Sequence, residues 1–231
     1  MKKLSSILAF LFLISAGPVT GSAQNAAAVE PQLVYKALQD KDCRHWVDSV
    51  MDRLSFKEKV GQLFIYTIAP LELLREAVDT YKVGGLLFSG GKLQNQVNLT
   101  NRAQRQAKVP VMITFDGEWG LAMRLRGTPV FPRNMVLGCI QDNRLIHAYG
   151  REVARQCKQI GAQVNFAPVA DVNINPKNPV INTRSFGENP IQVADKVIAY
   201  ASGLEEGGVL SVCKHFPGHG DTDIDSHKAL P

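Results

Sequence analysis

The sequence has few cysteines, little excess charge, and no apolar run long enough for a comfortable membrane span. Its four cysteines are too widely spaced for a dense disulfide framework, so one incidental disulfide and four free, mostly buried thiols are both compatible with it. The 26 Lys and Arg residues exceed the 21 Asp and Glu residues by only five, and they are scattered along the chain. This argues against a nucleic-acid-binding protein.

The first 23 residues have the pattern of a secretory signal peptide. Lys2 and Lys3 precede an apolar run of about eleven residues, and small residues follow it before Gln24. An uncleaved anchor is the alternative, but cleavage before Gln24 would leave no membrane span. We therefore expect an exported protein, periplasmic or extracellular, whose residues 24–47 form a lead-in.

From residue 48 onward, apolar runs alternate with amphipathic stretches. The runs that predict buried strands are 84–88, 109–115, 164–169 and 209–213. The stretches that predict helices are 70–82, 93–107, 142–160 and 190–206. A shorter helical segment at 54–64 carries a capping box at Ser55 and Glu58. Strands that alternate with helices predict a parallel sheet with right-handed crossovers.

Polar residues cluster directly after three of these strands. Asp116-Gly117-Glu118 follows the second, Asp171 and Asn173 follow the third, and Lys214-His215 follows the last. No glycine-rich phosphate loop opens any of the helices, so a (β/α)8 TIM-barrel type is favoured over an open doubly wound sheet. A complete barrel takes about 250 residues, and four or five βα units are recognisable. We therefore expect residues 48–231 to form an incomplete barrel domain.

Residues 214–227, KHFPGHGDTDIDSH, hold three of the five histidines. A zinc helix is disfavoured because Pro217 and two glycines separate the histidines. A calcium loop is disfavoured because Ser226 stands where glycine is needed. A solvated loop remains an alternative, but it does not explain a lysine directly after an apolar strand. Asp225 and His227, two residues apart, would share one side of an extended stretch, where the carboxylate would fix the imidazole tautomer for proton transfer.

Six blocks, in order, resemble glycoside hydrolase family 3, in particular its β-N-acetylglucosaminidase branch. They are LSFKEKVGQLF (54–64), GGLLFSGG (84–91), FDGEWG (115–120), VFPRNMVLG (130–138), NFAPVADVNINPKNPVINTRSFGENP (165–190) and KHFPGHGDTDIDSH (214–227). The resemblance covers the chain from about residue 48 to its end. It departs at Trp119, where the family usually has glycine, and this change would reshape the rim near Asp116.

The resemblance implies roles for particular residues. His227 would be the proton donor and acceptor, and Asp225 would orient it. The residues implied to bind sugar hydroxyls are Asp116, Arg124, Arg184, Lys214 and His215. The alternatives without a binding role are an exposed charge for Arg124 and an ion pair with Glu188 for Arg184. His219 would organise the loop, and Asp171 would have a structural role. The family's nucleophile is an Asp on a later strand, which would lie beyond Pro231.

The function implied is that of an exported, retaining exo-β-N-acetylglucosaminidase that needs no cofactor or metal. Its substrate would be a carbohydrate with terminal N-acetylglucosamine, such as a cell-wall muropeptide, and the short TRSFGE segment favours this sugar over glucose. A β-glucosidase and a β-N-acetylglucosaminide phosphorylase are alternatives within the family. A catalytically inactive sugar-binding barrel is the alternative outside the enzyme class. The sequence indicates no oligomeric state.

Overall fold

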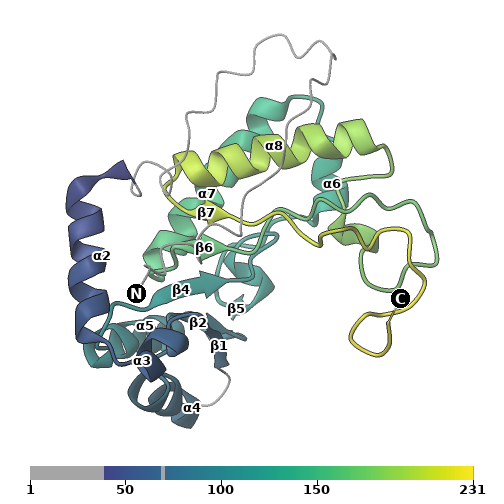
Figure 1. Ribbon diagram of the computed structural model, residues 1–231. Helices are drawn as coiled ribbons and strands as arrows, with labels where there is room; N and C mark the ends of the chain where they lie inside the picture. The colour runs from purple at the N-terminus through teal and green to yellow at the C-terminus, as the bar shows by residue number, and fades with distance from the viewer. Residues whose placement is uncertain (1–38, 69–70, 231) are drawn as a thin grey trace. The chain divides into compact units, whose positions relative to one another are not determined.

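The computed structural model describes residues 39–68 and 71–230, all within the unit that spans Pro31–Pro231 (Figure 1). The predicted signal peptide and most of the predicted lead-in, as well as Pro231, lie outside these residues. A five-stranded parallel sheet forms the centre, in the order β1-β2-β4-β6-β7. Its strands are β1 (Ile65–Ile68), β2 (Gly85–Phe88), β4 (Met112–Phe115), β6 (Val164–Asn165) and β7 (Leu210–Ser211).

The order of the strands in the sheet follows their order in the chain. Gly85 of β2 lies between Ile65 of β1 and Met112 of β4, and Val164 of β6 lies between Thr114 and Leu210. A doubly wound sheet would reverse direction at a switch point, whereas a barrel adds each strand next to the previous one. The fold is therefore of the TIM-barrel type, as the sequence predicted.

The long helices coincide with the predicted amphipathic stretches. They are α4 (Leu71–Arg75), continued by the π-helical turn η1 (Glu76–Thr80), then α5 (Leu93–Gln106), α7 (Asn143–Gln159) and α8 (Pro190–Glu206). The Asp142 side chain caps α7, and Asn189 caps α8, whose first residue is a proline. The starts of α7 and α8 therefore follow from local sequence.

The remaining elements are short apart from one helix near the N-terminus. They are α2 (Lys41–Arg53), α3 (Phe56–Gly61), β3 (Gly91–Lys92), η2 (Leu121–Met123), β5 (Leu125–Arg126), α6 (Asn134–Gly138) and η3 (Asn182–Arg184). Strands β3 and β5 pair with each other and stay outside the main sheet. The capping box at Ser55 and Glu58 is present at the start of α3.

Helices α7 and α8 pack along each other beside β6 and β7 (Figure 1). Two glycines permit this close approach, since a Cβ at Gly203 would lie 2.2 Å from the His147 carbonyl oxygen, and one at Gly150 would lie 2.4 Å from that of Tyr200. The core continues between these helices and the sheet through buried Val153, Leu204 and strand residues such as Ile113. The sheet and its helices thus form a rigid base for the loops that follow the strands.

The structure differs from the sequence predictions in several places. Strand β1 lies in a stretch predicted neither as helix nor as strand. Helix α3 ends at Gly61, where a side chain would meet the Tyr81 carbonyl oxygen at 2.0 Å, so Leu63 and Phe64 lie beyond it and are exposed. Strands β4, β6 and β7 are shorter than predicted, partly because Pro110 and Pro168 cannot donate to a ladder.

All four cysteines are free. The prediction of mostly buried thiols was wrong, because only Cys157 is buried, while Cys139 and Cys213 are exposed. Burial raises the pKa of the Cys157 thiol to about 12. Within the described part of the chain, no helix has the length and apolar character needed to cross a membrane.

Candidate functional site

The site lies at the carboxyl ends of three neighbouring strands. Asp116 directly follows β4, and Lys214 and His215 come shortly after β7. A bridge between Val169 and Lys214 extends the β6–β7 pairing and brings Asp171, two residues further on, beside the same loops. The parallel sheet therefore assembles side chains from three segments that are far apart in the sequence.

The turn that carries Asp116 and Glu118 is clamped through its central residue. Asn165, at the end of β6, accepts a hydrogen bond from Gly117 N (2.9 Å) and donates one to Gly117 O (3.1 Å). The buried Tyr200 hydroxyl, from α8, donates to the carbonyl oxygen of Glu118 at 3.1 Å. These bonds satisfy a buried backbone and fix the direction of both carboxylates.

Three cations pair with these two carboxylates. Lys214 Nζ lies 2.6 Å from Asp116 Oδ1 and 2.7 Å from Glu118 Oε1. Arg184 binds Glu118 in a bidentate manner, with Nη2 at 2.6 Å from Oε1 and Nε at 2.9 Å from Oε2. Arg124 forms an ion pair with Asp116. We call these five residues the charged network.

The network compensates for the burial of its carboxylates. The Glu118 side chain is 0% exposed, so its charge requires the two cations that surround it. Burial alone would raise the pKa of Asp116, but the charge and hydrogen bonds of Lys214 and Arg124 outweigh it and hold that pKa below its ordinary value. Both carboxylates are therefore fixed hydrogen-bond acceptors at this end of the sheet.

His215 connects the network to Asp171. Its Nδ1 lies 2.6 Å from Asp171 Oδ2, and its Nε2 lies 3.1 Å from Arg184 Nη2. Because guanidinium groups only donate, Nε2 is the acceptor in its contact with Arg184, and Nδ1 faces the Asp171 carboxylate. Both ring nitrogens are thus engaged within the protein, and donation by His215 to a sugar hydroxyl stays a prediction.

Asp171 is buried and holds two histidines. Its Oδ2 also accepts from His215 N at 3.1 Å, and its Oδ1 accepts from His219 N at 2.6 Å. Burial would raise the pKa of Asp171, but these hydrogen bonds outweigh it and lower that pKa. Asp171 thus organises the loop after β7, in keeping with the structural role expected for it.

Asp225 and His227 are in hydrogen-bond contact, with 2.7 Å between Asp225 Oδ1 and His227 Nδ1. The contact was predicted from an extended stretch, and that was wrong. The segment is a turn, in which Asp225 Oδ1 accepts from His227 N and Asp225 O accepts from Lys228 N. These bonds from His227 lower the pKa of Asp225. The His227 side chain is 81% exposed. Among the described residues, no hydrogen bond or ion pair joins this pair directly to the charged network.

The sequence did not predict Glu118 as a member of the site. It stands in the Asp-Gly-Glu triplet after a strand, and that position was the only available signal. The alternative pairing of Arg184 with Glu188 was wrong, because Arg184 binds Glu118. Arg124 is exposed, as its alternative had it, with 37% of its side chain accessible, and it also pairs with Asp116. Trp119 lies beneath the Arg133 guanidinium, 4.5 Å from its carbon to the ring centroid.

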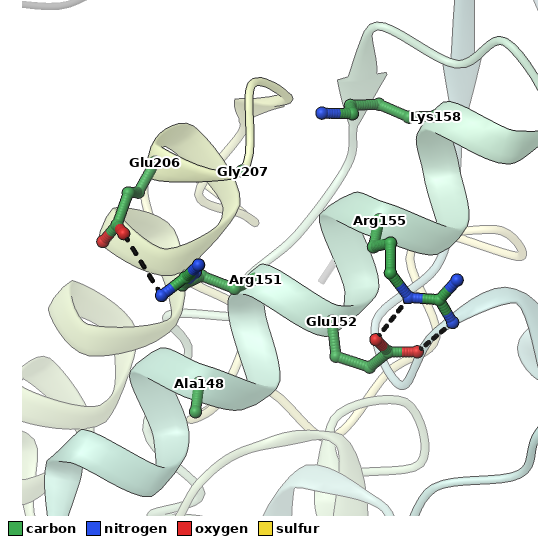
Figure 2. Close-up of a pocket in the computed structure, with 7 residues that line it drawn as sticks. All are labelled: Ala148, Arg151, Glu152, Arg155, Lys158, Glu206 and Gly207. Atoms are coloured by element: carbon green, nitrogen blue, oxygen red, sulfur yellow. Dashed lines mark hydrogen bonds and ion pairs between the residues drawn. The ribbon is translucent and has the colours of Figure 1, made fainter.

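A hollow of about 460 Å³ lies elsewhere, between α7 and the end of α8 (Figure 2). Two ion pairs line it: Arg155 with Glu152 at 2.7 Å, and Arg151 with Glu206 at 3.4 Å. Since the end of α8 precedes β7, this hollow lies toward the amino ends of the strands. It is therefore separate from the charged network. Within residues 39–68 and 71–230, no group of three or more His, Cys, Asp or Glu side chains is arranged to hold a metal ion.

The fold and the site define a TIM-barrel-type protein with a charged site at the carboxyl ends of its strands. Residues 55–231 match the family model described as the N-terminal domain of glycosyl hydrolase family 3, and the chain belongs to that family. It is 40% identical over 182 residues to β-hexosaminidase A of Pseudoalteromonas piscicida, which covers 71% of this chain and 30% of that protein. It is 33% identical to β-hexosaminidase LpqI of Mycobacterium tuberculosis, over 75% of this chain and 46% of that protein.

Solved structures show the same fold. A family 3 β-N-acetylglucosaminidase from Paenibacillus sp. FPU-7 superposes with a TM-score of 0.69 at 35% identity, over 75% of this chain and 35% of that one. The β-glucoside phosphorylase BglX superposes with a TM-score of 0.75 at 27% identity, over 81% of this chain and 34% of that one. The chain thus spans less than half the length of each of these proteins.

Proposed function

We propose that this chain belongs to an exported, retaining exo-β-N-acetylglucosaminidase that removes terminal N-acetylglucosamine from cell-wall fragments or related glycans. The observation that carries the proposal is the 2.7 Å contact between Asp225 and the exposed ring of His227. A carboxylate that accepts from Nδ1 fixes the imidazole tautomer and leaves Nε2 to exchange a proton with a substrate.

In the first step, His227 protonates the glycosidic oxygen while a carboxylate attacks the anomeric carbon. The bond between that carbon and the leaving oxygen breaks, and a glycosyl-enzyme forms. In the second step, neutral His227 takes a proton from water, which displaces the enzyme carboxylate. Asp225 stays ionised in both steps and stabilises the imidazolium, much as the carboxylate of a catalytic triad does.

The charged network would hold the sugar. Asp116 accepts hydrogen bonds, whereas Arg124, Arg184 and Lys214 donate, so a sugar hydroxyl would find both an acceptor and donors; the fully buried Glu118 would hold Arg184 and Lys214 in place. Because cations or His215 occupy Asp116, Glu118 and Asp171, none of these is free to attack carbon. The family resemblance implies that the nucleophile is instead an Asp on a later strand.

Relatives with β-hexosaminidase names and the β-N-acetylglucosaminidase structure support the choice of sugar. The test uses the full polypeptide with aryl N-acetyl-β-glucosaminide and aryl β-glucoside. We expect faster cleavage of the N-acetyl substrate. We expect His227→Ala to lower kcat/KM roughly 10²–10⁴-fold, least for good leaving groups.

His147→Ala is the matched control, because His147 also pairs with a carboxylate, Glu206, at 2.9 Å, but on α7 and away from the site. It should leave activity unchanged. Equal rates for His227→Ala and wild type would refute the acid/base assignment. No cleavage of either substrate by the wild type would favour a sugar-binding barrel.

Phosphorolysis is the second candidate, supported by the fold similarity to a β-glucoside phosphorylase. A neutral His base repels an incoming phosphate less than a carboxylate base would. Adding phosphate to the assay separates the two reactions, since phosphorolysis yields a sugar 1-phosphate and hydrolysis yields the free sugar.

Export is proposed from residues 1–23 alone. Expression in a bacterial host, followed by cell fractionation and N-terminal sequencing, tests it. A mature protein that begins at Gln24 outside the cytoplasm is expected, and an uncleaved cytoplasmic protein would refute it.

A further inference from the structure

The loop that carries Asp225 and His227 is joined to the rest of the described chain by one polar contact. Among the hydrogen bonds and ion pairs of residues 39–68 and 71–230, only one links residues 223–230 to the remainder. It lies between Ser226 Oγ and His219 Nε2, at 3.1 Å. The other bonds of this segment stay within it, and Asp225 takes part in each. Ser226 stands between the two residues of the proposed acid/base pair.

His219, in contrast, is held on every side. It is 7% exposed, and its Nδ1 lies 2.5 Å from Thr222 Oγ1. Its backbone N donates to buried Asp171, and its carbonyl oxygen accepts from Asn178 Nδ2, each at 2.6 Å. The imidazole is therefore a fixed point on an otherwise lightly attached loop.

The base of the loop is also fixed, up to residue 222. A Cβ at Gly220 would lie 1.8 Å from the Val172 carbonyl oxygen, so the backbone there packs directly on the loop that follows β6. Asn178 donates to Thr222 O at 2.9 Å. The part of the loop that is fixed to its neighbours thus ends at Thr222. Residues 223–230 are connected to it by the hydrogen bond between His219 and Ser226.

We propose that Ser226 and His219 are positioning residues that seat His227 over the sugar held by the charged network. This inference rests on the proposed function, in which His227 moves the proton. Loss of the contact leaves Asp225 and His227 bonded to each other, but no longer placed relative to Lys214 and Asp116. Proton transfer depends on such placement more than sugar binding does.

The test measures kcat/KM of the full polypeptide on aryl N-acetyl-β-glucosaminides with poor and good leaving groups. Ser226 is exposed, so Ser226→Ala should fold. We expect it to lower kcat/KM roughly 10–10²-fold for the poor leaving group. The effect should be small for the good one, which needs little acid assistance. Affinity for free N-acetylglucosamine should not change.

Two variants of His219 separate its contacts. His219→Gln keeps an amide near the position of Nε2, and His219→Asn keeps one near Nδ1. The glutamine variant should retain more activity on the poor leaving group, since only it can still bond to Ser226. Asp223→Ala, a change in the same loop at a side chain with no described hydrogen bond, should behave as wild type.

A double variant gives the decisive comparison. If Ser226 acts through His227, then Ser226→Ala combined with His227→Ala is no slower than His227→Ala alone. Losses that multiply, or an equal effect on both leaving groups, would overturn the proposal.

Hydrogen exchange tests the anchor without any activity. Ser226→Ala should speed exchange over residues 223–230 and leave β4 and β6 unchanged. Unchanged exchange over the loop would overturn the anchor, whereas a wild type without glycosidase activity would refute only the proposed function.

Discussion

Glu118 is the most deeply buried charge of the site, and its environment sets its energetic role. If Glu118 lost its charge, Lys214 would still bind the carboxylate of Asp116, whereas Arg184 forms its ion pair with Glu118. Breaking a buried ion pair from one side leaves a poorly solvated charge. Removing the charge of Glu118 therefore affects Arg184 more than Lys214.

We expect Glu118→Gln to lower the free energy of unfolding by about 3–5 kcal/mol. Glu152→Gln is the matched control: it alters another bidentate pair with an arginine, Arg155, which is half exposed at 55%. The control should change stability far less. Urea unfolding of the full polypeptide measures both, and equal losses would contradict the role given to burial.

The lowered pKa values of Asp116 and Asp171 make stability depend on pH. Between the folded pKa and the unfolded value of about 3.9, the unfolded chain binds more protons than the folded one. The free energy of unfolding should therefore hold through neutral pH and fall as pH drops below about 4. Urea titrations from pH 7 to 3 should show a shallower acid decline for Asp171→Asn. Asp195→Asn, at an exposed position of α8, should follow the wild type, and parallel declines in all three would contradict this prediction.

At the scale of elements, the contact between α7 and α8 depends on the absence of side chains at Gly150 and Gly203. A methyl group at Gly203 would clash with backbone, which cannot rotate away as a flexible side chain could. The helices would have to separate, and the core behind them would lose contacts.

We expect Gly203→Ala to destabilise the protein by about 1–3 kcal/mol, the usual cost of overpacking, despite alanine's better helix propensity. Ser202→Ala, one residue earlier in the same helix and partly exposed, should be neutral or slightly stabilising. Thermal unfolding measures both variants. A stabilised Gly203→Ala would mean that the two helices tolerate a wider spacing.

At the scale of the whole molecule, the sequence predicts the alternation of strands and helices and the TIM-barrel type well. Hydrophobic periodicity is a local signal in α5, α7 and α8, and α7 and α8 also have capping side chains. Strand β1 was missed because its four residues, IYTI, are too few to show a period, although each favours a strand; only Ile68 among them is buried. The ends of the other strands were overestimated, since periodicity alone does not show where pairing stops.

The site was predictable in part for the same reason. The positions of Asp116, Lys214 and His215 follow from where their strands end. The ion-pair partners of these residues do not follow from the sequence, because Arg184 and Glu118 are 66 residues apart and Lys214 and Asp116 are 98 residues apart. Only the three-dimensional structure shows which cation meets which carboxylate. The roles assigned to His227 and Asp225 stay predictions until the variants are assayed.

The agreement between strand order and chain order has a consequence for biosynthesis. Each strand that leaves the ribosome finds its neighbour in the sheet already present, so the sheet can grow in step with synthesis. The charged network cannot, because Glu118 emerges well before Arg184 and Lys214. Its carboxylate must stay hydrated until β7 docks, so the charged network forms only after this strand has been made.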